Sequence, residues 1–357
     1  MIKHYTIPFF ILHKGCPCQC VFCNQKKITG QEIPSPRDIP EKIERYLATM
    51  PRGEAEVEAG FFGGTFTGLP RDTQEALLKP VEPYIKKGLI SGIRLSTRPD
   101  LIDHDVLAFL REKGVSCIEL GVQSMSDRVL NASKRGHSAL DTENASRMIV
   151  RHGFRLCHQI MCALPLSTFE DECFTAVEAA RLGASQARIY PVLVIRGTEL
   201  EALYKRKEYT PLTEEEAVER CAMLLVYFGS MGISVIRCGL HPSEGLINGN
   251  DLVAGPFHPA FRMKAESRVF GMMLRYAREN PPGTIEEIAY NPSDEAAFYG
   301  FGKANAPEIK KIFGKNTPLV KSDGSILKNS LRFTGTGGVI VADRKIMAKM
   351  ILPEGMR

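Results

Sequence analysis

The hydrophobic and polar residues of this chain alternate between two periods, beginning near the N-terminus. Short apolar runs typical of strands are separated by segments whose apolar residues recur every three or four positions, as in amphipathic helices. The predicted strands cover residues 5–12, 57–62, 92–96, 115–122, 154–164 and 187–195. The predicted helices cover residues 38–50, 69–89, 103–113, 140–152 and 168–182, and another follows the capping box of Thr213 and Glu216. This alternation predicts βαβ units around a parallel sheet.

Six such units fit before about residue 235, and right-handed crossovers would close them into a barrel. We therefore predict an α/β fold in which residues 1–240 form a partial or three-quarter (β/α)6 barrel of the TIM type. Residues 241–357 predict a small C-terminal α/β extension with a helix after Phe261, a strand at 285–290 and a helix near Ile309. In such a barrel the functional loops follow the carboxyl ends of the strands.

The composition is that of an ordinary soluble globular protein. Of the 357 residues, 44% are hydrophobic and 24% are charged, without a run of about 18 apolar residues or a signal-peptide pattern. We therefore expect a cytoplasmic protein with no membrane partner, whose 10 cysteines are thiols or metal ligands. A net charge of +5 permits a polyanionic partner such as RNA without demonstrating one.

Three cysteines follow the first predicted strand with the spacing C-x3-C-x2-C, namely Cys16, Cys20 and Cys23. Three thiolates from one short loop can hold three irons of a cubic iron-sulfur cluster and leave the fourth iron open to a small ligand. A structural zinc site would favour C-x2-C pairs with a second pair or histidines. Disulfides are disfavoured in the cytosol. Cys18 is expected to be a bystander, because only the other three cysteines give this spacing.

The cysteine stretch, with Phe22 directly before its last cysteine, resembles that of the radical S-adenosylmethionine (SAM) enzymes. Further segments resemble the radical domain of the Elongator catalytic subunit and its short prokaryotic relatives, over roughly residues 1–240. These segments are residues 96–100, 119–124, 131–137 and 188–198. Residues 61–68 resemble the segment through which radical SAM enzymes hold the amino group of the methionine moiety. The oxygen-independent coproporphyrinogen oxidases share a looser version, mainly the Gly-Val-Gln-Ser and Arg-Gly-His stretches.

The resemblance implies a [4Fe-4S] cluster on the three cysteines, with SAM on its open iron. Cleavage of SAM to a 5′-deoxyadenosyl radical would follow an electron from an external donor of the flavodoxin or ferredoxin type. The residues implied to contact SAM are Phe22, Gly63, Gly64, Thr65, Ser96, Gln123, Arg135 and Gln159. Thr65 stands where the family often has an acidic residue, and Gln159 where the coproporphyrinogen oxidases carry an acid on the ribose. Arg135 pairing with a helix C-terminus is the structural alternative.

The Elongator likeness implies modification of a nucleoside in a structured RNA, with tRNA as the expected partner. The candidate substrate contacts near the predicted mouth are Lys26, Lys27, Arg98, Tyr190 and Arg196, although Tyr190 filling the barrel is an alternative. Two other functions stay open: a radical SAM enzyme acting on a tetrapyrrole or another small metabolite, and a non-catalytic iron-sulfur, haem-binding or RNA-binding protein. The Elongator subunit carries an acetyltransferase domain, but the C-terminal extension is smaller than expected for one, so no acetyl-CoA is expected.

Overall fold

The computed structural model describes residues 3–12, 14–24, 34–50, 55–314 and 319–354. The chain divides into two compact units, which interleave along the sequence. The first consists of Met1–Pro211 and His241–Gly255, and the second of Leu212–Leu240 and Pro256–Arg357. The predicted domain boundary at residue 240 stays a prediction.

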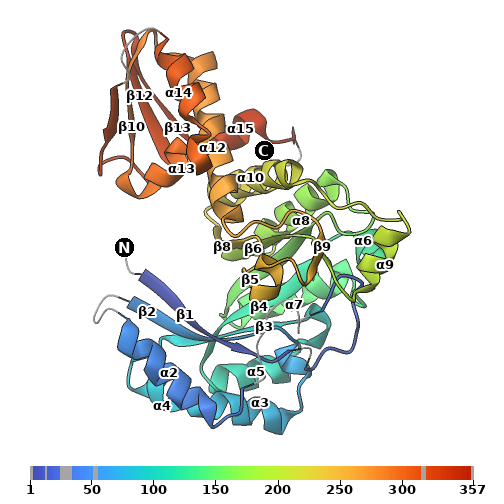
Figure 1. Ribbon diagram of the computed structural model, residues 1–357. Coiled ribbons are helices and arrows are strands. Elements are labelled where there is room, and N and C mark those ends of the chain that lie inside the picture. Colours follow the sequence, from blue (N-terminus) through green and yellow to red (C-terminus); the bar gives the residue numbers. More distant parts are fainter. Residues whose placement is uncertain (1–2, 13, 25–33, 51–54, 315–318, 355–357) are drawn as a thin grey trace. The chain divides into compact units, whose positions relative to one another are not determined.

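The first unit is built on a parallel sheet that curls into a half-barrel (Figure 1). Its strands are β1 (Lys3–Phe10), β2 (Ala55–Phe62), β3 (Gly92–Thr97), β4 (Val115–Gln123), β5 (Arg155–Cys162) and β6 (Gln186–Pro191). Neighbours in this order pair in parallel, and β8 (Ser234–Cys238) is the next strand in the sheet order. The predicted partial barrel is confirmed.

Helices connect the strands and cover one face of the sheet (Figure 1). The helices of the first unit are α2 (Asp38–Thr49), α3 (Arg71–Leu78), α4 (Glu82–Lys86), α5 (His104–Glu112), α6 (Asp127–Ala132), α7 (Ala139–Arg151), α8 (Phe169–Arg181), α9 (Glu199–Lys205) and α11 (Glu244–Ile247). The ammonium of Lys42 in α2 lies 5.3 Å from the centre of the Phe9 ring. In α7, the hydroxyl of Ser146 lies 2.9 Å from Nε2 of His158. Phe9 and His158 therefore mark the helix-covered face.

The two faces of this sheet differ in chemistry. The helix-covered face is apolar, with fully buried side chains such as Phe9, Phe61 and Leu95. The opposite face carries charged side chains on alternating positions, including Glu58 of β2 and Arg94 of β3. Parallel strands are usually apolar on both faces. The charged inner face is therefore the feature of this sheet that needs a functional explanation.

Two of the predicted elements are broken in the structure, and a proline stands at each break. The helix predicted over 69–89 is broken into α3, a 3₁₀ turn (Lys79–Val81) and α4, with Pro80 and Pro83 in the first turns of the last two pieces. The strand predicted over 187–195 ends at Pro191. After it, β7 (Val194–Ile195) pairs antiparallel with β9 (Leu252–Ala254).

The second unit packs helices beside a four-stranded sheet. Its helices are α10 (Glu214–Ser230), α12 (Phe261–Glu279), α13 (Glu295–Tyr299), α14 (Ala306–Phe313) and α15 (Arg344–Ile351). The sheet order is β11-β10-β12-β13, with β10 (Ile285–Tyr290), β11 (Leu319–Ser322), β12 (Ser330–Gly335) and β13 (Gly338–Asp343). The predicted small α/β extension is confirmed, as is the Thr213 capping box at the start of α10. Among the described residues, no helix has the length and apolarity needed to cross a membrane.

Candidate functional site

The cysteine loop, residues 11–24, leaves β1 at the carboxyl end of the parallel sheet. Cys20 is buried, and Cys16, Cys18 and Cys23 are partly exposed. None of the four forms a disulfide with another described cysteine. Because the strands of the half-barrel are parallel, the loops after β2 to β6 meet at the same end. The segments predicted to form the site therefore lie at this end of the sheet.

The cysteine loop packs tightly against the turn that follows β2. The backbone N–H of Thr65 donates to the carbonyl of Lys14 over 3.0 Å, and the Thr65 hydroxyl lies 3.0 Å from Sγ of Cys16. Gly15 has a φ of +72°, and a side chain there would collide with the Thr65 carbonyl oxygen. A side chain at Gly68 would likewise collide with the carbonyl of Gly15. The two segments approach this closely only because glycine stands at both positions.

The backbone of Val21 joins the cysteine loop to two other segments by hydrogen bonds. Its N–H donates to the carbonyl of Ser133 over 3.2 Å, and its carbonyl accepts from the N–H of Leu200 over 2.8 Å. Its side chain belongs to a buried apolar cluster of Val21, Val129, Leu164, Val192, Val194, Leu200 and Tyr209. Phe22, predicted to contact SAM, packs against this cluster. Hydrophobic packing therefore fixes the segment between the last two cysteines.

Arg135 brings a positive charge to one cysteine. Its Nη1 donates to Sγ of Cys20 over 3.3 Å, and its Nη2 donates to the carbonyl of Gly121 over 2.7 Å. Arg98 holds this arrangement, because its Nη1 donates to the backbone carbonyl of Arg135 over 2.7 Å. The rest of the Arg98 guanidinium makes a two-pronged ion pair with Asp100. The Arg135 guanidinium is therefore held beside the Cys20 sulfur by two further hydrogen-bonded groups.

Cys18 packs against the residue that directly follows Arg135. Its Sγ lies against Gly136, where any side chain would collide with it. Gly136 also has a φ of +70°, a conformation that favours glycine. The bystander role expected for Cys18 stays a prediction.

Buried polar atoms beside the cysteines lack partners among the described residues. They include Oε1 of Gln123 and Nε of Arg135, whose residues are 9% and 7% exposed. Gln123 is also held at a φ of +66°, a strained conformation typical of functional positions. Burial and the neighbouring Arg135 and Arg98 charges lower the pKa of His137 to about 3, so its imidazole is neutral. An unpaired acceptor and donor beside three soft ligands fit a cluster with SAM, which carries amine, carboxylate, ribose and adenine groups.

The predicted residues Ser96 and Gln159 meet on the charged inner face of the sheet. Nε2 of Gln159 donates to Oγ of Ser96 over 3.0 Å and to Oε2 of Glu119 over 2.8 Å. Burial alone would raise the pKa of Glu119, but Arg188 and Arg94 lower it, so the carboxylate is ionised. Nη1 of Arg188 is 3.4 Å from the Tyr190 hydroxyl. This network connects predicted cofactor contacts with a predicted substrate contact.

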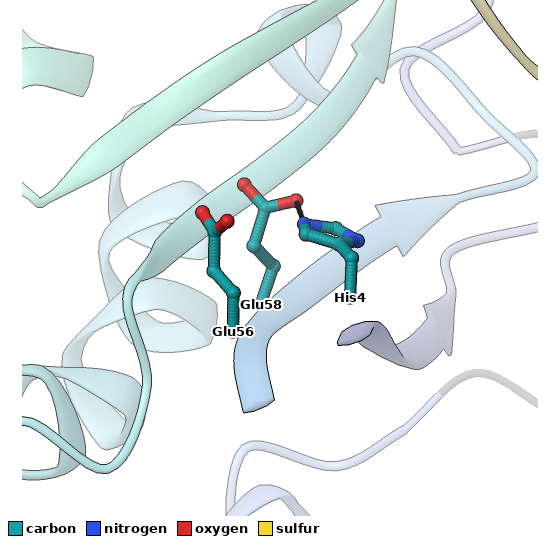
Figure 2. Close-up of side chains that lie close together, drawn as sticks. All are labelled: His4, Glu56 and Glu58. Atoms are coloured by element: carbon teal, nitrogen blue, oxygen red, sulfur yellow. Dashed lines mark ion pairs between the residues drawn. The ribbon is translucent and has the colours of Figure 1, made fainter. Parts of the chain in front are cut away.

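A second cluster lies toward the amino ends of the strands, where His4, Glu56 and Glu58 come together (Figure 2). Their ligand atoms lie within 4.8 Å of one another, as in a metal site. However, Glu58 already pairs with Nε2 of His4 at 2.8 Å, with Nε of Arg94 at 2.9 Å and with Arg155. Two guanidinium groups on the same carboxylate repel a cation. The cluster is therefore an ion-pair network.

The remaining candidate substrate residues occupy different environments. Lys26 and Lys27 lie outside the described residues. Arg98 is 1% exposed and is occupied by its loop contacts. Arg196 is exposed, and its Nε donates to the carbonyl of Asn250 over 2.9 Å. Gly63 and Gly64 lie in the turn after β2, where a side chain at Gly64 would meet the carbonyl of Lys14. Their roles toward a ligand stay predictions.

Sequence reasoning assigned no role to Glu119, Arg94 or Arg188. All three charges lie inside strands, and Glu119 and Arg94 are essentially fully buried. One feature of the sequence could have pointed to them: charged residues stand at alternating positions of strands that are otherwise apolar. Charges are almost never fully buried unless they are paired. That pattern could have identified an inner polar network, although it could not have identified the pairs.

Two family models match the chain: the Radical SAM superfamily over residues 10–173 and the Radical_SAM C-terminal domain over residues 184–270. A tRNA uridine(34) acetyltransferase of Methanocaldococcus infernus is 29% identical over 247 residues, which cover 57% of this chain and 46% of the relative. Elongator complex protein 3 of Homo sapiens is 27% identical over 245 residues, which cover 58% of this chain and 45% of the relative. The chain thus spans under half the length of these curated relatives.

A solved structure of the archaeal Methanocaldococcus infernus Elp3 with an N-terminal deletion has the same fold. Its TM-score is 0.58 at 20% sequence identity, and the match covers 78% of this chain and 64% of that chain.

Proposed function

We propose, from the premise that this chain belongs to the radical SAM superfamily, that it holds a [4Fe-4S] cluster and uses SAM to modify a nucleoside of an RNA. The cluster ligands in this proposal are Cys16, Cys20 and Cys23. The expected RNA is a tRNA, and the expected electron source is a small flavodoxin-type or ferredoxin-type protein. No acetyl-CoA takes part.

The observation that carries the proposal is the contact between Arg135 and Cys20 over 3.3 Å. It places a fixed cation on one thiol of a three-cysteine loop, beside unpaired buried polar atoms of Gln123 and Arg135. When bound, the cluster and SAM supply the one-electron cleavage of a carbon–sulfur bond. The chain's residues bind and orient the cofactor and exclude water. Gln123, Ser96 and Gln159 offer hydrogen bonds, and the apolar cluster around Val21 fixes the segment between the last two cysteines.

RNA as the substrate is supported by the names of relatives, one of which is a tRNA uridine(34) acetyltransferase. The alignment spans under half of that protein, so the reaction that follows hydrogen abstraction is not carried over. Arg196 is an exposed cation three residues before α9, and the sequence places Lys26 and Lys27 just after the cysteine loop. Cations near the cysteine loop in sequence suit a partner with a phosphate backbone.

The cofactor part of the proposal is tested by anaerobic reconstitution, reduction with dithionite and chromatographic detection of 5′-deoxyadenosine. The wild-type chain should form it from SAM, and Cys16→Ala should not. Absence of 5′-deoxyadenosine from a wild-type chain that has its full iron content would overturn the proposal.

The RNA part is tested by the salt dependence of tRNA binding. We expect the logarithm of the affinity to fall with the logarithm of salt at a slope of at least about three. Exchange of Lys26, Lys27 and Arg196 for Ala should flatten that slope. A matched control variant removes three positive charges elsewhere, by Lys86→Ala, Arg147→Ala and Arg181→Ala. The salt slope of this control should equal that of the wild type. No tRNA binding at about 50 mM salt would favour a small metabolite as the substrate.

A further inference from the structure

We infer that Glu119 is a positioning residue that fixes which way the side-chain amide of Gln159 faces, and thereby sets the hydrogen bonds offered to the bound nucleoside. The inference rests on the proposed function for the identity of that nucleoside, the adenosyl part of SAM. It assigns a role to a carboxylate that is not expected to touch the cofactor itself.

Glu119 lies in the middle of β4, and its side chain has no exposed surface. Both of its oxygens are engaged. Oε1 accepts from Nη1 of Arg94 over 2.7 Å and from Nη2 of Arg188 over 2.8 Å. Oε2 accepts from Nε2 of Gln159 over 2.8 Å and lies 2.8 Å from Nε of Arg188. Two guanidinium groups keep the carboxylate ionised inside the protein.

An ionised carboxylate can only accept hydrogen bonds. Gln159 must therefore turn its NH₂ group toward Glu119, because the opposite orientation would set its carbonyl oxygen against a negative charge. The same NH₂ group donates to Oγ of Ser96 over 3.0 Å. Oε1 of Gln159 consequently faces away as an acceptor, and the Ser96 hydroxyl keeps its proton to donate.

A fixed acceptor beside a fixed donor suits a sugar hydroxyl, which both donates and accepts. If the amide could flip, Gln159 would present a second donor, and one of the two hydrogen bonds would be lost. A ligand that leaves a buried polar group unpaired binds with a penalty. Glu119 thus acts on cofactor affinity through Gln159.

The chain supplies a matched control in Glu58. It is also a fully buried carboxylate of the inner face, and it also pairs with Arg94, at 2.9 Å. Its other partners are His4, which Figure 2 shows beside it, and Arg155 and Ser116. A change at Glu58 therefore disturbs the same arginine without removing the partner of Gln159.

The experiment measures binding of S-adenosylhomocysteine, a redox-inert analogue, to the reconstituted protein by calorimetry. Glu119→Gln has nearly the same shape but can donate or accept, so the orientation of Gln159 is no longer dictated. We expect the dissociation constant to rise about tenfold, as for the loss of one good hydrogen bond. Glu119→Asp keeps the charge and should restore part of the affinity, whereas Glu58→Gln should stay within about twofold of wild type.

A second readout is the electron paramagnetic resonance spectrum of the reduced cluster on addition of SAM, which should need a higher SAM concentration in Glu119→Gln. If Glu119→Gln does not fold, Gln159→Met replaces it, since it removes the amide and leaves the carboxylate with its arginines. The same loss of affinity is expected.

Equal affinity of a folded, cluster-loaded Glu119→Gln and the wild type would overturn the inference, as would equal losses in Glu119→Gln and Glu58→Gln. Both results require that the wild type binds the analogue. A cluster-loaded wild type that binds neither the analogue nor SAM would instead overturn the proposed function.

Discussion

Nη1 of Arg135 donates a hydrogen bond to Sγ of Cys20 over 3.3 Å, across 115 positions of sequence. The other terminal nitrogen of the same guanidinium is fixed on the carbonyl of Gly121. The charge therefore cannot swing away from the sulfur without breaking a second buried hydrogen bond. Hydrogen bonds to cluster sulfurs and nearby charges are among the factors that set the reduction potential of iron-sulfur centres.

Replacing Arg135 should make the cluster harder to reduce. In Arg135→Ala a positive charge that favours the extra electron is lost, so the reduction potential should fall by on the order of 50 mV, roughly 1 kcal/mol for one electron. Arg135→Lys keeps the charge but loses the two-pronged geometry. Its reduction potential should lie between those of the wild type and Arg135→Ala. Redox titration followed by electron paramagnetic resonance measures the potential. Arg128→Ala, which removes an exposed arginine paired with Asp171, is the control. A potential that is the same in Arg135→Ala and the control would contradict the prediction.

The cysteines should separate into ligands and a bystander. Replacing Cys16, Cys20 or Cys23 by Ala should abolish the visible charge-transfer absorption of the cluster and the iron content of the reconstituted protein. Cys18→Ala should keep both, because its thiol packs against Gly136. Iron and sulfide analysis after anaerobic reconstitution decides the matter. A Cys18→Ala protein without iron, or a Cys16→Ala protein with its full complement, would show that the ligand set is wrong.

Gly15 and Gly88 offer a test of the close approach between the cysteine loop and the turn after β2. Both have positive φ, +72° and +67°, but a side chain at Gly15 would strike the Thr65 carbonyl, whereas one at Gly88 would meet nothing within 4 Å. Gly88→Ala should therefore cost only the backbone strain, about 1 to 2 kcal/mol. Gly15→Ala should cost more and also lower iron incorporation. Thermal unfolding and iron content report the two effects, and equal behaviour of the two variants would argue against the tight contact.

Glu58 should make stability depend on acid. Burial would raise its pKa, but the bond with His4 and the charges of Arg94 and Arg155 lower it to about 2. The unfolded chain therefore binds the proton more readily, and the stabilisation is complete above about pH 4.5 and is lost as the pH falls toward 2. Relative to Glu58→Gln, the advantage of the wild type should reach roughly 3 kcal/mol near neutral pH and shrink below about pH 4.5.

The measurement is the difference in unfolding free energy between wild type and Glu58→Gln at several pH values. A difference that is the same at about pH 3 and about pH 7 would mean that Glu58 is not held ionised by its partners.

The parallel half-barrel could be predicted from the sequence because each strand and helix carries its own period. The broken segments show the limit of that approach. The apolar residues between 69 and 89 keep a helical period across Pro80 and Pro83. A prediction from periodicity alone therefore missed these two prolines, each of which stands in the first turn of a new helical piece. Pro191 likewise separates β6 from β7, although the apolar run continues through it.

The cysteine motif could be recognised from the sequence because its three candidate ligands lie within eight consecutive residues, from Cys16 to Cys23. The polar network around Glu119 could not be recognised in this way, because its members come from four different strands. Glu119 meets Arg94, Gln159 and Arg188 only through the register of β3, β4, β5 and β6. Register depends on tertiary packing, and a single sequence does not reveal it.

The two backbone bonds of Val21 have a consequence for how the protein is made. They join the cysteine loop to Ser133 and Leu200, which the ribosome adds more than a hundred residues later. A nascent chain that ends before these partners has its thiols but cannot hold them in place, since such long-range contacts come with the folded half-barrel. If the loop binds a cluster, we therefore expect insertion to follow the folding of the half-barrel through at least Leu200.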